Sequence, residues 1–144
     1  PNPSNIGRHV TSTLDFLRAP DLLATINDIS KNVDPGTVVI SKANCGIPEF
    51  VDGNIMYSGT EELMSQYVQI AMNSGAKIIG GCCGTSFDHV RAMRKAMDQH
   101  SVSSPPTLQE IEERVGVMSE GSKLIFQGDD SKPTKQRRSR RSRV

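Results

Sequence analysis

A run of glycine and cysteine at residues 80–85 constrains this chain more than any other feature. The apolar pair Ile78-Ile79 leads into Gly80-Gly81-Cys82-Cys83-Gly84-Thr85. A strand seldom carries so much glycine unless the backbone must turn sharply or something must approach it closely. Adjacent side chains on a regular strand point to opposite faces, so two neighbouring cysteines can share one ligand only where the strand has ended. The run therefore predicts a short strand that ends in a turn bearing two thiols, which indicates metal or redox chemistry.

Around this run, apolar residues alternate between helical and strand patterns. They recur at helical spacing from Leu22 to Ile29, just after Pro20, a residue well placed at a helix start. The β-branched run at 37–41 is typical of a buried parallel strand. The expected order is a helix from Pro20, a strand at 37–41, a helix after residue 58, a strand at 77–81 and a helix capped by Ser86 or Thr85. Helices that alternate with buried strands argue for parallel β/α units, whose functional loops follow the C-terminal ends of the strands.

Local residue patterns add detail to two of these helices. Ser58 and Glu61 have the spacing of a capping box, in which a serine oxygen and a glutamate carboxylate satisfy the first free amides of a helix. In the helix that Ser86 or Thr85 caps, Val90, Met93 and Met97 share one apolar stripe. We expect these three side chains to face inward.

The chain divides into four segments. Residues 1–19 are irregular and lack a predicted strand, 20–100 hold the β/α units, 101–131 form a linker and a C-terminal arm, and 132–144 are disordered by composition. In the arm, a second capping box at Thr107 opens a short helix to about Val115, and we expect 116–130 to be irregular. Two strands cannot close a sheet, and a complete β/α barrel needs about 250 residues. We therefore expect an α/β chain that holds the last part of an incomplete barrel.

Composition narrows the class of protein. The 144 residues include 4% aromatic residues and no Trp, so the chain can build only a modest core. No run approaches the roughly 18 apolar residues of a membrane span, and the N-terminus lacks the order of a signal peptide. We expect a cytoplasmic protein without a membrane partner. Three cysteines, two of them adjacent, do not form the even framework of a secreted disulfide scaffold, which favours a metal site or a catalytic thiol.

Basic residues are concentrated at the C-terminal end. Residues 132–144 contain seven Lys and Arg and no acid, which leaves 10 basic and 16 acidic residues, a net charge of −6, in residues 1–131. Such a tail could neutralise nucleic-acid phosphates, but it has no aromatic residue for base stacking. We favour a solvated tail, or one that docks on the acidic body of a neighbouring subunit in a homo-oligomer. Nucleic-acid binding is the weaker alternative.

The cysteine run and an upstream loop together carry a family resemblance. Gly80-Gly81-Cys82-Cys83-Gly84-Thr85, preceded by Asn44-Cys45-Gly46-Ile47-Pro48, resembles the zinc- and homocysteine-binding domain of homocysteine S-methyltransferases over residues 20–99. The resemblance implies the last units of a TIM-like (β/α)8 barrel, with Cys82 and Cys83 as two of three zinc-ligating thiolates. It also implies homocysteine and a small methyl donor as substrates and methionine as product. The donor, whether betaine, a methyl-folate or a sulfonium compound, stays open.

Zinc suits the chemistry that these residues indicate. A free thiol is mostly protonated at neutral pH and is then a poor nucleophile, whereas zinc with an open position lowers the pKa of a bound thiol. The homocysteine sulfur could then attack an electrophilic methyl group. Asn44 and Gly81 are candidate substrate-binding residues, although an asparagine that tolerates a tight turn explains Asn44 equally well.

The third thiolate is where this chain departs from the family pattern. Aligned on Pro20-Asp21, the upstream Asn-Cys of the family falls on Asp15-Phe16, so phenylalanine occupies the ligand position. Cys45 ends on the same rim and is a candidate surrogate ligand, although the matching family position is not a ligand. We expect a chain altered or truncated before residue 20. The alternatives are a catalytically inactive homologue that serves as a structural or oligomerisation module, and a cysteine pair that forms a redox-active disulfide or stays inert.

Overall fold

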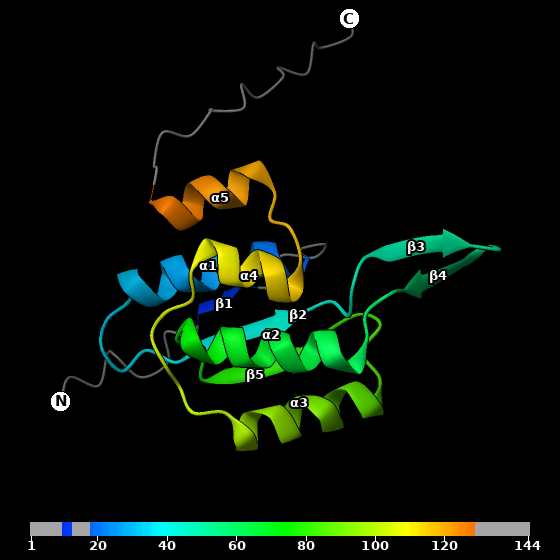
Figure 1. Ribbon diagram of the computed structural model, residues 1–144, viewed down its shortest axis with the longest axis horizontal. Coiled ribbons are helices and arrows are strands. Elements are labelled where there is room, and N and C mark those ends of the chain that lie inside the picture. The colour runs from blue at the N-terminus through cyan, green and yellow to red at the C-terminus, as the bar shows by residue number, and fades with distance from the viewer. Residues whose placement is uncertain (1–9, 13–17, 129–144) are drawn as a thin grey trace, which may run out of the picture.

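The computed structural model describes residues 10–12 and 18–128 (Figure 1). Its elements are β1 Val10–Ser12, α1 Ala19–Asn32, β2 Val39–Ala43, β3 Pro48–Val51, β4 Asn54–Tyr57, α2 Glu61–Asn73, β5 Ile78–Gly81, α3 Phe87–Gln99, α4 Leu108–Val115 and α5 Glu120–Gln127. Three strands form a parallel sheet in the order β1-β2-β5, and β3 pairs with β4 in an antiparallel hairpin. The mixed α/β architecture with parallel β/α units confirms the alternation that the sequence predicts. The basic tail and Phe16 lie outside the described residues.

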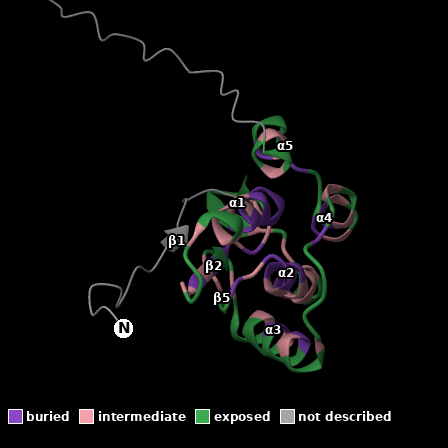
Figure 2. Cartoon of the chain, turned by 90° about the vertical axis from the view of Figure 1, so that its left-hand side faces the viewer, coloured by how far each residue is buried: buried purple, intermediate pink, exposed green. Residues whose placement is uncertain are grey.

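The helices α1, α2 and α3 lie on one side of the sheet (Figure 2). In β2, Val39, Ser41 and Ala43 are buried on the helix side, and the exposed Lys42 points the opposite way. The β2–β5 register places Ile78, which is 52% exposed, beside Ile40 on the second face of the sheet. No described helix covers that face.

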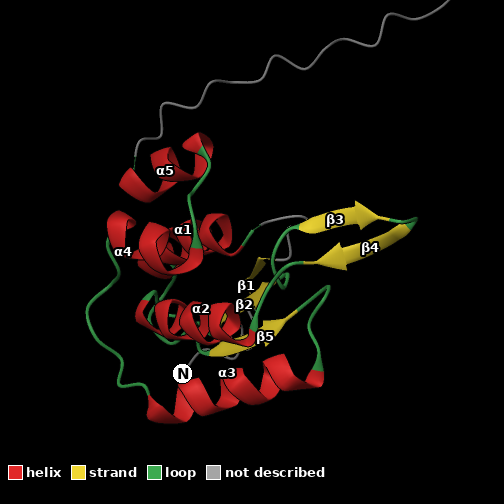
Figure 3. Cartoon of the chain, turned by 45° about the vertical axis from the view of Figure 1, so that its right-hand side comes forward, coloured by secondary structure: helices red, strands yellow, loops and turns green. Residues whose placement is uncertain are grey.

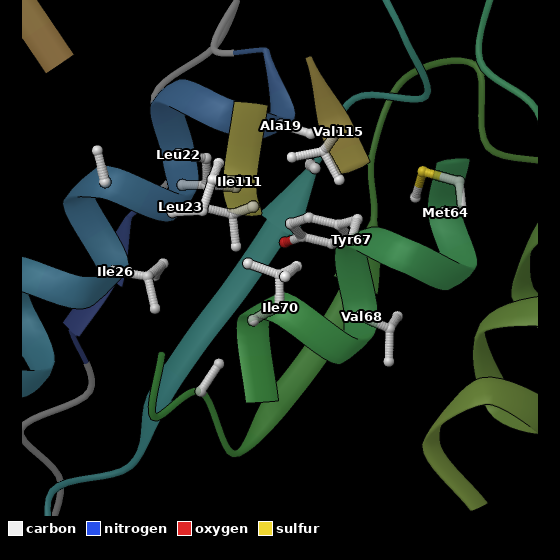
Figure 4. Packing of buried hydrophobic residues seen from close by; sticks show 14 of the residues in the cluster. Ala19, Leu22, Leu23, Ile26, Met64, Tyr67, Val68, Ile70, Ile111 and Val115 are labelled. Atoms are coloured by element: carbon white, nitrogen blue, oxygen red, sulfur yellow. The ribbon is translucent and has the colours of Figure 1, made fainter. Parts of the chain in front are cut away.

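The core lies between the sheet and the helices α1, α2 and α4 (Figure 4). Leu22, Leu23 and Ile26 face it from α1, as the helical spacing predicts. The Tyr67 ring of α2 is fully buried, and its hydroxyl lies 2.5 Å from the Ser41 hydroxyl of β2. Burial raises the pKa of Tyr67 far above its ordinary value, and the bond to Ser41 opposes this only in part. This hydrogen bond therefore satisfies two polar groups that the core would otherwise leave unpaired.

The sheet differs from the predicted one in two respects. Residues 10–12 form β1, which pairs in parallel with β2, so the expectation that residues 1–19 contain no strand is wrong. The sheet consequently has three strands and not two. The strand expected at 37–41 begins and ends two residues later, as β2. A three-residue strand has too little pattern to be found from sequence, because its stability depends on the neighbour with which it pairs.

The hairpin β3–β4 lies between β2 and α2, where the predicted order of elements contains no strand. Asp52 and Gly53 join its strands, with φ values of 49° and 82°. Positive φ at both central residues is the mark of the type I′ turn, and Asp-Gly between apolar runs favours that turn. The hairpin projects from the body of the molecule (Figure 3), and its Phe50 is 77% exposed.

The helix ends confirm some of the predicted caps and correct others. Ser86 caps α3, as predicted. The N-cap of α2 is Thr60, whose hydroxyl accepts from the Leu63 amide, so the capping box expected at Ser58 is wrong. On α3, Met93 is buried and Met97 packs against the core, but Val90 is 50% exposed and does not face inward.

The C-terminal arm is more ordered than expected. Helix α4 forms with Thr107 as its N-cap, which confirms the predicted helix. The segment 116–130 was expected to be irregular, but it contains α5, capped by Ser119. Helix α5 packs beside α1, and Lys31 lies over the Phe126 ring. None of the helices in the described ranges is both long enough and apolar enough to cross a bilayer.

A buried carboxylate ties α5 to α1. Asp21, 5% exposed in the first turn of α1, accepts from the Ser119 amide at 2.8 Å and from Arg18 Nε at 3.1 Å. Burial by itself would raise the pKa of Asp21, but the hydrogen bonds from Ser119 and Ser122 and the charge of Arg18 lower it overall. The contact between α1 and α5 through Asp21 is therefore strongest when the Asp21 carboxyl is ionised.

Replacing Asp21 by asparagine should lower the free energy of unfolding at pH 7 by about 1–3 kcal/mol, because buried donors lose a charged acceptor. Because folding lowers the pKa of Asp21, the ionised side chain adds stability above its ordinary pKa of 3.8, and this stability disappears as the pH falls through the folded pKa. Urea unfolding at pH 7 and pH 3 should show the gap between the two proteins shrinking in acid. Asp34→Asn, at an exposed turn, is the matched control. A gap that is absent at pH 7 or that widens at pH 3 would contradict this assignment.

Candidate functional site

The two adjacent cysteines lie in a tight turn that directly follows β5. The Thr85 amide donates to the Cys82 carbonyl at 3.2 Å, which closes a four-residue turn. Gly84 is the third residue of this turn and has a φ of +75°, a value that glycine adopts without strain. Cys82 is half-buried and Cys83 is exposed, and their sulfur atoms are 3.9 Å apart. The break in the strand therefore brings both thiols together, as the glycine run predicts.

The loop after β2 holds this turn by backbone hydrogen bonds. Cys82 N–H donates to the Ala43 carbonyl at 2.8 Å, and Cys45 N–H donates to the Cys83 carbonyl at 2.9 Å. The Asn44 side-chain oxygen accepts from Cys83 N–H at 3.2 Å. The ladder between β2 and β5 thus continues past both strand ends and fixes the position of the cysteine turn relative to the neighbouring loop.

These contacts define what the candidate substrate residues do in the structure. The Asn44 amide oxygen is engaged by the turn, so this residue orients the cysteine loop. Gly81 ends β5 beside Ala43, and a Cβ at this position would collide with the Thr85 side chain. A role of either residue in substrate binding stays a prediction.

Cys45 is placed differently from the other two cysteines. Its side chain is fully buried, and a Cβ added to Gly59 would lie 2.6 Å from its sulfur. Burial raises the pKa of the Cys45 thiol, which opposes the thiolate form that a metal requires. Within the described residues, no three His, Cys, Asp or Glu side chains form a group that could hold a metal ion. The structure therefore does not group Cys45 with the pair.

Comparison with known families identifies the region that contains this site. A family model for homocysteine S-methyltransferase matches residues 8–97. The chain belongs to the homocysteine S-methyltransferase family. The match begins just before β1 and ends within α3, so it includes both loops and the cysteine turn.

The zinc that this family implies can be tested against the two sulfurs. Thiolate ligands lie about 2.3 Å from zinc, and in a tetrahedral site two of them are therefore about 3.8 Å apart. The observed separation of 3.9 Å matches one edge of such a tetrahedron. Cys82 and Cys83 fit as two ligands, and the described residues supply no third. The ligand position that aligns with Phe16 lies outside the described part of the chain.

One residue of the site is not indicated by any sequence motif. Tyr57, the last residue of β4, lies against the cysteine turn, because a Cβ on Gly84 would come within 2.7 Å of its ring. The neighbouring Cys83 side chain, partial burial and the charges of both cysteines raise the pKa of the Tyr57 hydroxyl. The Asp52-Gly53 pair could have indicated the hairpin, but nothing in the sequence indicates that the hairpin meets the cysteines.

Proposed function

We propose that this chain carries the thiol-activating site of a homocysteine methyltransferase, which transfers a methyl group to homocysteine and yields methionine. The observation that carries the proposal is the pair of sulfurs 3.9 Å apart at the end of a parallel strand. Cys82 and Cys83 would hold a zinc ion. The basic tail, on which a nucleic-acid function would depend, lies outside the described residues.

The arrangement of the β/α units supports a barrel as the parent architecture. Strands that are consecutive among the β/α units are neighbours in the sheet, and their helices lie on one side of it (Figure 2). A doubly wound sheet would carry helices on both faces. In a closed β/α barrel the helices form an outer ring and the sites follow the C-terminal strand ends. The uncovered face with Lys42 and Ile78 corresponds to the interior of such a barrel.

The residues of this chain contribute to the reaction by holding the two cysteine sulfurs in place. The turn after β5 places both sulfurs close together. Asn44 and the loop after β2 hold this turn in position by hydrogen bonds. When bound, zinc supplies the Lewis acidity that lowers the pKa of a substrate thiol. In the transfer, a bond forms between the homocysteine sulfur and the methyl carbon while the bond from that carbon to the donor breaks. The electron pair of the broken bond leaves with the donor, and the thiol proton goes to solvent.

Metal analysis combined with a substrate assay tests this proposal. We expect the full chain to bind one zinc ion and to bind homocysteine only when zinc is present, measured by atomic emission and by calorimetry. Methionine formation is then assayed with betaine, a methyl-folate and a sulfonium donor in separate reactions. A chain that binds neither zinc nor homocysteine would contradict the proposed site.

A further inference from the structure

Among the strand residues of the hairpin β3–β4, one is shielded from solvent by the body of the molecule. Seven of its eight strand residues are exposed, and only Tyr57 is partly buried. The β3–β4 register places Pro48 opposite Tyr57 and Phe50 opposite Ile55, so these four side chains share one face of the hairpin. Phe50 and Ile55, farther from the body on this face, are 77% and 62% exposed. Tyr57 is therefore the strand residue of the hairpin that is most shielded from solvent.

The contact that Tyr57 makes is with the cysteine turn itself. A Cβ on Gly84 would overlap Cβ, Cγ and Cδ2 of Tyr57, so the aromatic side chain lies directly against the Gly84 backbone. Only glycine at position 84 permits both this packing and the φ of +75°. Cys83 is next to Gly84 in the same turn, and its side chain raises the pKa of the Tyr57 hydroxyl, which is consistent with a position beside it. The Tyr57 ring thus packs on the backbone of the turn beside the two cysteines.

We propose that Tyr57 is a positioning residue for the thiol site: its ring clamps Gly84 and its hydroxyl donates a hydrogen bond to the Cys83 sulfur. This inference rests on the proposed function, since it assigns a residue that supports Cys83 as a ligand. A ligand that accepts a hydrogen bond from a fixed neighbour keeps one orientation. The hairpin is inserted between β2 and α2, and its role is to place Tyr57 against the cysteine turn.

Cadmium binding by the full chain tests the proposal, because the thiolate-to-cadmium absorbance reports the cysteine sulfurs directly. Tyr57→Phe keeps the ring and removes only the hydroxyl, and it should weaken cadmium binding about tenfold. Tyr57→Ala also removes the clamp on Gly84 and should weaken binding further. The matched control is Phe50→Ala, on the same face of the hairpin but away from the turn, which should bind cadmium like the wild type. Equal affinity in the wild type and in both Tyr57 variants would overturn the proposal.

A second measurement, on the metal-free chain, separates this inference from the proposed function. At pH 9.5 most thiols are ionised, so the alkylation rate by iodoacetamide reports how well each sulfur is covered. Loss of a hydrogen bond from Tyr57 should speed the labelling of Cys83 about fivefold in Tyr57→Phe, with Cys82 unchanged. If the wild type binds no cadmium but Cys83 responds in this way, the zinc proposal fails and the role of Tyr57 stands. Unchanged Cys83 labelling would overturn the role of Tyr57 even if cadmium binds.

Discussion

Replacing Cys82 or Cys83 by serine is expected to weaken zinc binding by at least about a hundredfold, because loss of a direct ligand should cost more than loss of a supporting hydrogen bond. A serine hydroxyl is not ionised at neutral pH and cannot replace a thiolate. The sulfurs are 3.9 Å apart, a distance that suits two ligands of one tetrahedral zinc site, so each variant removes one of these two ligands. Zinc content after dialysis and competition with a chromophoric chelator measure the effect.

The matched control for this experiment is Cys45→Ala. This third cysteine is buried and not grouped with the pair, so its removal should leave the zinc stoichiometry unchanged. The cavity it leaves should lower stability modestly, by roughly 1 kcal/mol. A large loss of zinc in Cys45→Ala would instead make it the surrogate third ligand. If both serine variants retained full zinc, the cysteine turn could not be the metal site.

Truncating Tyr67 to alanine should cost about 3–5 kcal/mol of unfolding free energy, the largest stability effect we expect in this chain. Tyr67 is fully buried in the core cluster that also contains Leu23 and Ile111 (Figure 4). Loss of the Tyr67 side chain leaves a cavity, and the buried Ser41 hydroxyl of β2 loses its hydrogen-bond partner. Domains of ordinary stability have only 5–15 kcal/mol in total, so this variant should be close to unfolding at room temperature.

Tyr67→Phe separates the two contributions to this effect. The ring stays and only the bond to Ser41 is lost, so the cost should be about 1–2 kcal/mol. Urea unfolding followed by circular dichroism gives both values. The same loss in the two variants would mean that the hydroxyl, and not the ring volume, dominates. No loss in either would show that the helix α2 does not pack on the sheet as described.

Much of the β/α order could be predicted because it depends on local patterns. Apolar spacing defines α1 and α2, and the glycine run places the end of β5 and the turn with Cys82 and Cys83. These features follow from the backbone preferences of a few adjacent residues, so the sequence is sufficient. The hairpin could have been predicted for the same reason, since Asp52-Gly53 favours a type I′ turn. The capping box at Ser58 failed because Thr60 offers an equally good hydroxyl nearer to the helix.

By itself, the sequence determined that two thiols follow a strand, that β/α units surround them and that the family motif is present. Only the tertiary structure decided which distant residues meet. The strand β1 exists through its pairing with β2, and α5 docks through the Asp21–Ser119 hydrogen bond across 98 positions of sequence. The packing of Tyr57 against Gly84 is of the same kind. Such contacts depend on how whole elements pack, and no local pattern of residues carries that information.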